Sequence, residues 1–317
     1  MLRYTARRTG LAVLNLIIVM IAMYAMVFLV PGDPASVALG PRATPELKAE
    51  LVIRMGLDQP VWRQVWNFFA NAVQGNLGYD VWSGRPVLDQ ILEAFPNTLI
   101  LGGVALGWAL VLGVALGCLA VVWRGGIVDT LLGLLSVSMI AVPSFVIAIY
   151  ALLVFAVWLN WLPAIGAGTA GDIGSQVRAL ILPAFAIGIT WVGYLARLVR
   201  ASMLEVMGEA HIRTARAFGL SEFRIITRYA LRLAIIPTLA VLAVGFGSIL
   251  SAAVFVETVF SRPGIGTLII TAVAKRNYPL VMGTTLFMTA FYLFVVTAAD
   301  LVIARLDPRV RDVFRGG

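Results

Sequence analysis

The sequence predicts an all-α membrane protein with six transmembrane helices, and its composition and apolar runs are the evidence. Of its 317 residues, 61% are hydrophobic and only 13% are charged, and the mean hydropathy is +0.95. Soluble domains, in contrast, are about half apolar and a quarter charged. A helix needs roughly 20 apolar residues to cross the hydrocarbon core of a bilayer. Six runs without a charged residue have about this length or more, and they cover residues 11–30, 99–123, 130–158, 179–196, 233–256 and 277–299.

The distribution of arginine and lysine predicts how these helices are oriented. An even number of spans places both termini on one side, and the side richer in Arg and Lys is cytoplasmic. The two termini, Arg124 and the loop at 197–232 carry 15 of the 24 basic residues, whereas the opposite side carries 9. We therefore expect cytoplasmic N and C termini, and we interpret the net charge of +8 as a topology signal rather than as a nucleic-acid-binding surface.

A small extracytoplasmic segment at 31–98 follows the first run. That run is longer than the roughly 7–15 apolar residues of a signal peptide, so we expect an uncleaved anchor. A turn cluster at 31–34 precedes a helix candidate, Pro45–Met55, for which Thr44 is a suitable N-cap. Aromatic residues follow near helical spacing, namely Trp62, Trp66, Phe68 and Phe69. Two interpretations stay open: a cap that contacts a substrate-delivery protein, or an amphipathic helix on the lipid headgroups.

Glycine and proline predict how the later helices pack and bend. Two GxxxG patterns, at 103–107 and 113–117, have the spacing that lets helix backbones approach closely in a membrane. Pro143 interrupts the third run and Pro183 the fourth, so we expect kinks there.

A few residues that break or polarise the apolar runs are candidates for a gate or for the pathway. They are Pro143, Ser144, Ser248, Ser251 and Glu257. The serine hydroxyls could line a polar passage or hydrogen-bond between helices, and the pattern alone allows both. Glu257 ends the fifth run at the outer face, where it could line an outer gate or lie in water.

The loop at 197–232 is the longest polar interruption in the C-terminal two-thirds of the chain. Its residues 201–218 have good helix propensity, and Phe218 is among their expected apolar contacts. Gly219 is placed to end this helix in a left-handed conformation. Ser221 is then the N-cap of a second helix, with Glu222 in its first turn. Such a short helix between two spans can transmit force from a cytoplasmic partner, although an ordinary solvated loop has a similar composition.

Residues 209–221 read EAHIRTARAFGLS and resemble the EAA-type loop of ATP-binding cassette (ABC) importer permeases, in the version of the dipeptide/oligopeptide/nickel family. Further matches run along essentially the whole chain. They include GDP at 32–34, LDQP at 57–60, GNLG at 75–78, PNTL at 96–99, VETVF at 256–260, PGIG at 263–266 and DPRVR at 307–311. The sequence departs from the general loop at 213–215, where Arg-Thr-Ala replaces Glu-Ala-Ala.

The resemblance implies a type I ABC importer permease-like fold and a division of the chain into three parts. Residues 1–94 would hold the first transmembrane helix and the extracytoplasmic segment, residues 95–304 a five-helix core, and residues 305–317 a cytoplasmic tail. The loop at 197–232 would couple the core to a cytoplasmic ATPase by inserting into its groove. The residues expected to dock are Glu205, Glu209, His211, Arg213, Thr214, Ala215, Gly219 and Leu220.

The resemblance also implies the partners and the cargo. The expected partners in a prokaryotic plasma (inner) membrane are a second homologous permease subunit, one or two cytoplasmic ABC subunits, an extracytoplasmic substrate-binding protein and the lipid bilayer. ATP and Mg would bind to the ATPase subunits, and no cofactor or metal is expected in this chain. Dipeptides or oligopeptides are the expected cargo, and nickel or another small solute is the alternative.

Other function classes find little support in the residues. Neither lysine, Lys48 or Lys275, follows a glycine, so the chain lacks a Walker-type phosphate loop and is not expected to be an enzyme. The single histidine and the single cysteine offer little catalytic or metal-binding equipment. A secondary transporter is less favoured, because we find neither inverted repeats nor an acidic residue near the centre of a span.

Overall fold

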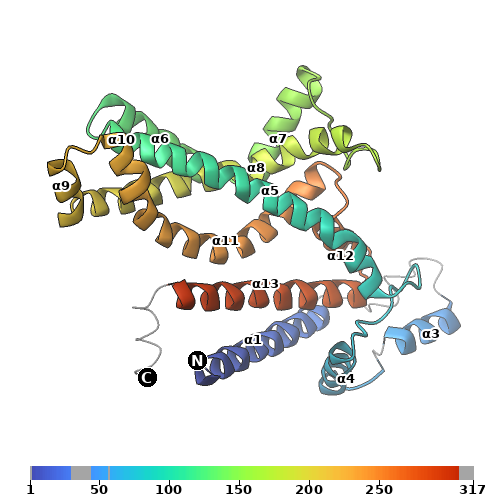
Figure 1. Cartoon of the computed structure of the whole chain (residues 1–317). Helices are drawn as coiled ribbons and strands as arrows, with labels where there is room; N and C mark the ends of the chain where they lie inside the picture. Colours follow the sequence, from blue (N-terminus) through green and yellow to red (C-terminus); the bar gives the residue numbers. More distant parts are fainter. Residues whose placement is uncertain (1, 30–43, 56–57, 307–317) are drawn as a thin grey trace. The chain divides into compact units, whose positions relative to one another are not determined.

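The computed structural model describes residues 2–29, 44–55 and 58–306, and these residues are helical nearly throughout (Figure 1). In this described part, an isolated bridge between Tyr79 and Pro86 is the only strand-like pairing. The prediction of an all-helical protein is confirmed. The turn cluster at 31–34 and the motif at 307–311 lie outside the described residues.

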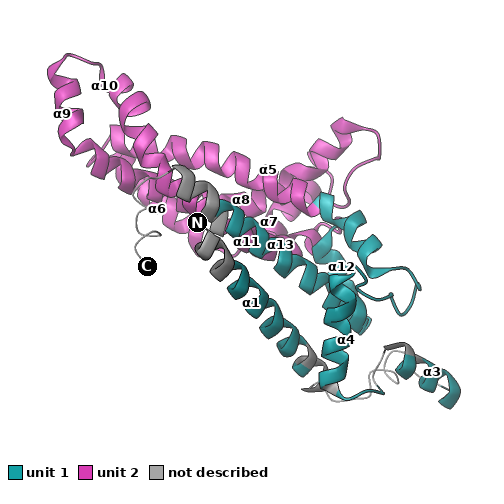
Figure 2. Cartoon of the chain, turned by 60° about the horizontal axis from the view of Figure 1, so that its bottom comes forward, with its two compact units in different colours: residues 1–97, 263–317 teal, residues 98–262 magenta. Residues whose placement is uncertain are grey.

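The chain forms two compact units (Figure 2). Unit 1 comprises residues 1–97 and 263–317, and unit 2 comprises residues 98–262. The boundary near residue 97 falls inside one continuous helix, α5 (Val87–Val122). The division of the chain at 94 and 304 stays a prediction. It separates consecutive segments of the sequence, whereas the two units are defined by packing, and unit 1 combines segments from both ends of the chain.

Unit 1 is built around the apolar faces of helices from both ends of the chain. Its helices are α1 (Leu2–Leu29), α3 (Pro45–Met55), α4 (Val61–Val73), α12 (Ile265–Ala274) and α13 (Tyr278–Leu306). Helix α13 packs on α1 and α12, and α4 packs on α1. Together with the start of α5 they form a core that includes Met20, Ile91, Ile265 and Leu280, and the Phe95 ring of α5 meets Phe287 edge-on at 5.1 Å.

The segment that follows the first apolar run folds as expected where the structure describes it. Helix α3 has the predicted bounds, and the Thr44 hydroxyl accepts a hydrogen bond from the Leu47 amide at 3.3 Å, as an N-cap does. Helix α4 turns Phe68 and Phe69 toward the core of unit 1 and exposes Trp62 and Trp66. Both interpretations of this segment stay open, because either a headgroup layer or a partner protein would cover such an aromatic face.

Unit 2 contains the remaining helices. After the rest of α5 come α6 (Ile127–Ala141), α7 (Ser144–Ala151), the π-helix η2 (Leu152–Trp158) and α8 (Ile173–Met207). The chain continues through α9 (Ala210–Ala217), α10 (Glu222–Arg224), the π-helix η3 (Ile225–Ala230) and α11 (Leu231–Val259). Helix α8 packs against α6, α7 and α11 and is the centre of the unit.

Small residues allow this close packing. A Cβ atom placed on Gly117 would lie 2.8 Å from the carbonyl oxygen of Ala196, and one on Gly113 would lie 2.7 Å from the Cβ of Leu195. The predicted close approach at 113–117 is therefore confirmed, with α8 as the neighbour. The pattern at 103–107 shows no such contact, because a Cβ on Gly103 or Gly107 would meet no atom within 4 Å in the structure.

The number of membrane spans is settled in part. Among the described residues, four helices are long and apolar enough to cross a bilayer: Val87–Val122, Ile173–Met207, Glu222–Leu242 and Tyr278–Ala299. A fifth crossing arises if Ile127–Ala141 and Ser144–Trp158 count as one span, although they meet at 96°. The kink expected at Pro143 is thus a sharp break, whereas α8 continues through Pro183. The count of six spans stays a prediction.

The packing of α5 on α8 generates a first test. Gly117→Ala should destabilise the protein by about 1–3 kcal/mol, because the added methyl group meets backbone that has no room to move. Gly107→Ala on the same helix is the matched control and should be neutral or slightly stabilising, because its methyl group meets open space. Thermal unfolding of the purified protein in detergent compares the two. Equal melting temperatures would contradict the packing described here.

Candidate functional site

The basic loop between α8 and α11 forms a compact helical hairpin rather than an extended connection. Helix α8 ends at Met207, and the amide of Gly208 donates to the carbonyl oxygen of Glu205 at 3.1 Å. Glu209 then adopts an extended conformation and precedes α9. The single helix predicted over 201–218 is therefore wrong. Its first part is the end of α8, and the chain turns at Gly208, where the low helix propensity of glycine favours a break.

The turn after α9 has the predicted form. Gly219 has φ +75, and the amide of Leu220 donates to the carbonyl oxygen of Ala215 at 3.3 Å, as in a Schellman motif. Ser221 occupies the position before α10 in an extended conformation, but its side chain makes no capping hydrogen bond. The guanidinium of Arg216 spans the turn to the carboxylate of Glu222 at 2.6 Å. This pair is exposed on both sides, so it orients the turn more than it stabilises it.

An apolar core holds the hairpin against the end of α8. Met203 and Val206 of α8, Ile212 and Ala215 of α9, and Ile225 of η3 are all buried in one cluster. We call these five residues the hairpin core. Since α9 is anchored through its inner face, the hairpin moves together with the end of α8 and the start of η3.

The structure separates the expected docking residues into two groups. Glu205, Glu209, His211, Arg213, Thr214 and Gly219 are exposed. Ala215 is buried in the hairpin core and Leu220 is half-buried against it. These last two side chains support the surface of the hairpin and do not form part of it. Among the exposed residues, His211 lies with its Nδ1 3.0 Å from a carboxylate oxygen of Glu209.

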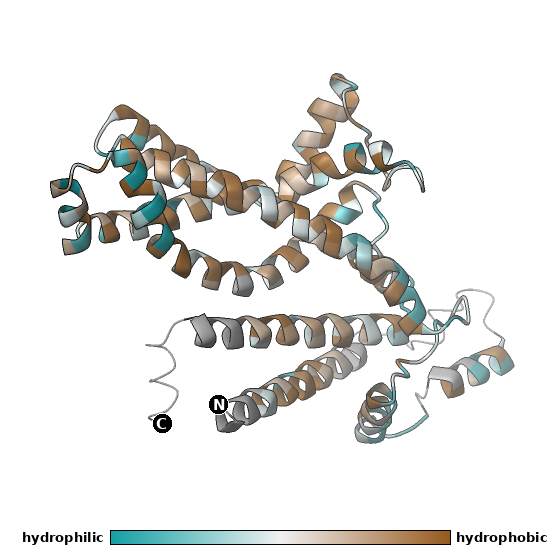
Figure 3. Ribbon diagram, viewed as in Figure 1, coloured by the Kyte–Doolittle hydropathy of each residue, from teal (hydrophilic) through white to brown (hydrophobic). Residues whose placement is uncertain are grey.

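Two aromatic residues belong to this surface and were not among the predicted docking residues. Phe218 is 81% exposed and Phe223 is 78% exposed, and they flank the turn at Gly219. The expectation that Phe218 packs inward is therefore wrong, because Ile212 and Ala215 fill the inner face of α9. Figure 3 shows hydrophilic residues concentrated around α9 and α10. The sequence shows two phenylalanines in a polar segment, but it does not specify that both side chains point outward.

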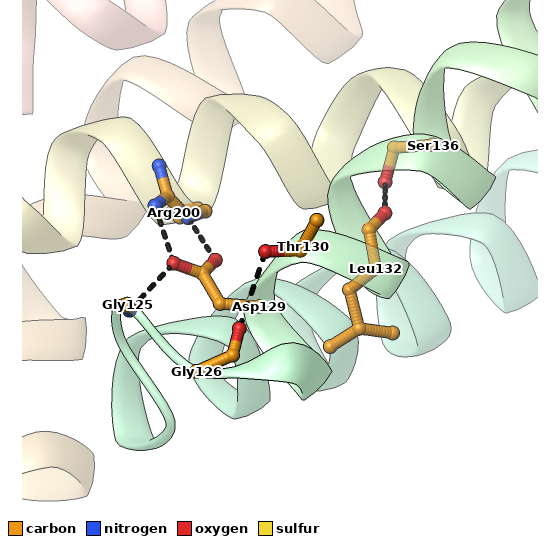
Figure 4. A network of polar contacts seen from close by, with 7 residues as sticks. All are labelled: Gly125, Gly126, Asp129, Thr130, Leu132, Ser136 and Arg200. Atoms are coloured by element: carbon orange, nitrogen blue, oxygen red, sulfur yellow. Dashed lines mark hydrogen bonds and ion pairs between the residues drawn. The ribbon is translucent and has the colours of Figure 1, made fainter.

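A half-buried ion pair lies at the base of the hairpin (Figure 4). Asp129, in the first turn of α6, accepts hydrogen bonds from Nε and Nη2 of Arg200 on α8, at 2.6 and 2.7 Å. The amide of Gly125 donates to the same carboxylate at 3.0 Å. Asp129 is only 8% exposed. The two residues are far apart in the chain, and the sequence offers no local pattern that pairs them.

The structure places the candidates for a gate or pathway in two regions of unit 2. Helix α7, which begins after Pro143 with Ser144, packs on α11, and the rings of Phe145 and Phe255 lie 6.2 Å apart. Ser248 and Ser251 are exposed on the same face of α11 as Phe255. The structure therefore brings these candidates into one region of unit 2.

Glu257 lies apart from this region. It is two residues beyond Phe255, which places it about 200° around the helix axis. Its side chain is fully buried and accepts a hydrogen bond from the Thr98 hydroxyl of α5 at 2.6 Å. Of the two interpretations offered by the sequence, exposure to water is wrong. The carboxylate joins α11 to α5 within unit 2.

Comparison with known proteins agrees with the resemblance noted in the sequence. The family model described as "Binding-protein-dependent transport system inner membrane component" matches residues 109–312, and the model of the corresponding N-terminal region matches residues 1–102. The glutathione transport system permease protein GsiC of Escherichia coli (strain K12) is 35% identical over 311 residues, which cover 98% of this chain and 99% of that protein. GsiC of Shigella flexneri serotype 5b has the same identity and coverage.

A solved structure supports the fold. The inward-facing MetNI methionine ABC transporter, in its native crystal form, includes a chain that superposes with a TM-score of 0.56 at 16% identity. The superposition covers 68% of this chain and 96% of the other. At this identity it shows the fold alone. The two family models together account for most of the sequence, so the chain belongs to the binding-protein-dependent transport system inner membrane components and is an inner-membrane permease of an ABC importer.

Proposed function

We propose that this permease forms half of a translocation pathway for dipeptides or oligopeptides and couples to cytoplasmic ATPases through residues 209–220. The observation that carries the coupling is the hairpin itself. It presents an exposed surface of cationic and aromatic side chains on a core that is continuous with the end of α8. A helix held in this way can receive a force at its exposed face and pass it to the helices beneath.

The exposed chemistry of the hairpin fits a groove on a partner protein. Phe218 and Phe223 offer rigid aromatic anchors, which are enriched at the centres of protein interfaces. Arg213 offers a planar guanidinium for bidentate recognition of carboxylates. Glu205, Glu209, His211 and Thr214 would supply the polar rim. The partners in this proposal are one or two ATPase subunits, which bind ATP and Mg, because this chain has no Walker-type loop.

The proposed cycle uses differential contact with two states. Closure of the ATPases on ATP would shift the hairpin and convert the cavity from inward-open to outward-open, and hydrolysis would restore the inward state. Such a shift requires that the ATPases bind the two conformations with different affinities. A substrate-binding protein would deliver cargo from outside, and a second homologous permease would complete the pathway. The proposal includes six spans with both termini in the cytoplasm, which the excess of basic residues on that side supports.

The proposed cargo rests on similarity. The relatives at 35% identity are named for glutathione transport, and glutathione is a short peptide. The test is uptake by proteoliposomes that contain the whole importer and its binding protein. Radiolabelled glutathione, radiolabelled Ala-Ala and radiolabelled Ni²⁺ are offered separately, and the same three compounds are used unlabelled as competitors. ATP-dependent uptake that peptides inhibit is the expected result, whereas uptake of nickel without any peptide uptake would overturn the cargo assignment.

The aromatic anchors generate a prediction about assembly. Phe218→Ala and Phe223→Ala should each weaken binding of the ATPase subunit by about 30-fold, because each removes a side chain of hot-spot type worth about 2 kcal/mol. Titration of purified ATPase subunit onto the permease in nanodiscs measures the affinity. Phe294→Ala is the matched control, because Phe294 is 69% exposed but belongs to α13 of unit 1 and is not a residue of the hairpin. Wild-type affinity in both hairpin variants would refute the anchor role.

The turn at Gly219 generates a prediction about coupling. Gly219→Pro should abolish stimulation of ATP hydrolysis by the loaded binding protein, because proline cannot adopt φ +75 and lacks the amide that donates to the carbonyl oxygen of Arg216. Gly219→Asn is the control and should retain most of the stimulation, since asparagine tolerates the left-handed region. The assay uses the reconstituted complex. If the proline variant is stimulated as well as the asparagine variant, the shape of this turn is not needed for coupling.

A further inference from the structure

The Asp129–Arg200 pair has the geometry of a rigid connection between helices. Both guanidinium–carboxylate hydrogen bonds are short, at 2.6 and 2.7 Å, and the paired planes fix the relative orientation of the two side chains (Figure 4). The Gly125 amide holds the carboxylate from a third side, through a turn in which Gly125 has φ +75. The carboxylate is therefore held by its own loop as well as by α8.

The position of Arg200 connects the pair to the hairpin. Arg200 lies one turn before Met203, the first residue of the hairpin core, and about two turns before the end of α8. No residue of α6 belongs to the cluster of buried residues around the hairpin core in the described part of the chain. The cluster does include Val121 of α5, which continues into α6 through the loop at 123–126, but α8 is the helix that packs along α6. A displacement of the hairpin can therefore reach α6 through α8, and the ion pair lies where α8 enters the hairpin.

A second contact attaches α6 to α8 at another point along its length. Further along α6, a Cβ on Gly193 of α8 would lie 2.5 Å from the carbonyl oxygen of Ser136, so the two backbones touch there. Asp129 and Ser136 are seven residues apart, or about 10 Å along the helix. Two separated attachment points on one partner prevent α6 from rotating independently of α8. Beyond them, α6 ends at the 96° break, and α7 carries Phe145 against Phe255 of α11.

We infer that the Asp129–Arg200 pair is a positioning device that makes α6 and the break at Pro143 follow the hairpin when the ATPases move it. The inference rests on the proposed function of the hairpin. In this inference, movement of the hairpin by the ATPases is passed through α8 and α6 to the candidate pathway residues. Asp129 and Arg200 touch neither cargo nor nucleotide in this scheme and act by holding helices in register.

The test is a double-mutant cycle in the complete importer, reconstituted in nanodiscs with its ATPases and second permease. The variants are Asp129→Asn, Arg200→Gln and the two combined, and the readout is ATP hydrolysis with and without the loaded binding protein. Each variant should assemble and keep its basal rate but lose about fivefold or more of the stimulation, the lower range of an allosteric coupling. The double variant should be no worse than either single variant, because all three remove one connection.

Arg197→Gln is the matched control. It is the same substitution one turn earlier on α8, at an exposed position, and should leave the stimulation unchanged. Stimulation in the pair variants equal to that of Arg197→Gln would overturn the inference. Loss of stimulation only in proportion to loss of assembled complex would also overturn it, because that result shows a role in stability alone.

A reversible covalent bridge between α6 and α8 tests whether the pair acts by connecting the two helices or through its charges. In a Cys118→Ala background, which removes the only cysteine of this chain, Asp129→Cys and Arg200→Cys can be joined by a bis-methanethiosulfonate reagent. The bridge should restore stimulation, and a reducing agent should remove it again. A bridged complex that stays uncoupled would contradict the inference even if the charge variants had failed to fold.

Arg213→Glu, on the exposed face of the hairpin, distinguishes failure of this inference from failure of the proposed function. If Arg213→Glu abolishes stimulation while the pair variants keep it, only the role of the ion pair is wrong. If no ATPase subunit assembles with the wild-type chain, or Arg213→Glu has no effect on coupling, the proposed docking of the hairpin is wrong and the inference falls with it.

Discussion

Unit 2 depends on close contact between helix backbones along α8. In a bilayer the hydrophobic effect does not drive one apolar helix onto another, so van der Waals contact and interhelical hydrogen bonds must hold them together. Glycines supply that contact on several sides of α8. Gly113 and Gly117 of α5 lie against it, and its own Gly193 lies against α6. Because these contacts involve backbone atoms, the helices around α8 have little freedom to slide, and α8 can act as the axis of the unit.

The hairpin between α8 and α11 extends this rigidity beyond the apolar spans. Its core is small but fully apolar, so the exposed face can be charged and aromatic without loss of order. The residues that resemble the EAA-type loop are therefore of two kinds, those that support the hairpin from within and those on its exposed surface. Ala215 and Leu220 belong to the support, whereas Arg213 and the flanking phenylalanines belong to the surface. A motif read along the sequence combines both kinds, because adjacent positions on a helix point in different directions.

Buried polar groups connect the helices at chosen points of unit 2. Asp129 meets Arg200 between α6 and α8, and Glu257 meets Thr98 between α11 and α5. The two carboxylates are buried, and removing them from water is costly unless each keeps its hydrogen-bond partner. Polar pairs of this kind therefore specify which helices meet and in which register.

The sequence by itself determined the class of the protein, the approximate helices and the conformation of one turn. The composition and the length of the apolar runs indicate helices buried in lipid, and Gly219 indicates a backbone conformation that other residues avoid. Both are local properties of the chain. Tertiary structure alone decided that α8 continues into the loop as far as Met207, that Phe218 points outward, and that Glu257 is buried against Thr98. It also decided the pairing of Asp129 with Arg200. Each of these depends on which face of a helix meets a neighbour, and helical periodicity within one segment does not specify the neighbour.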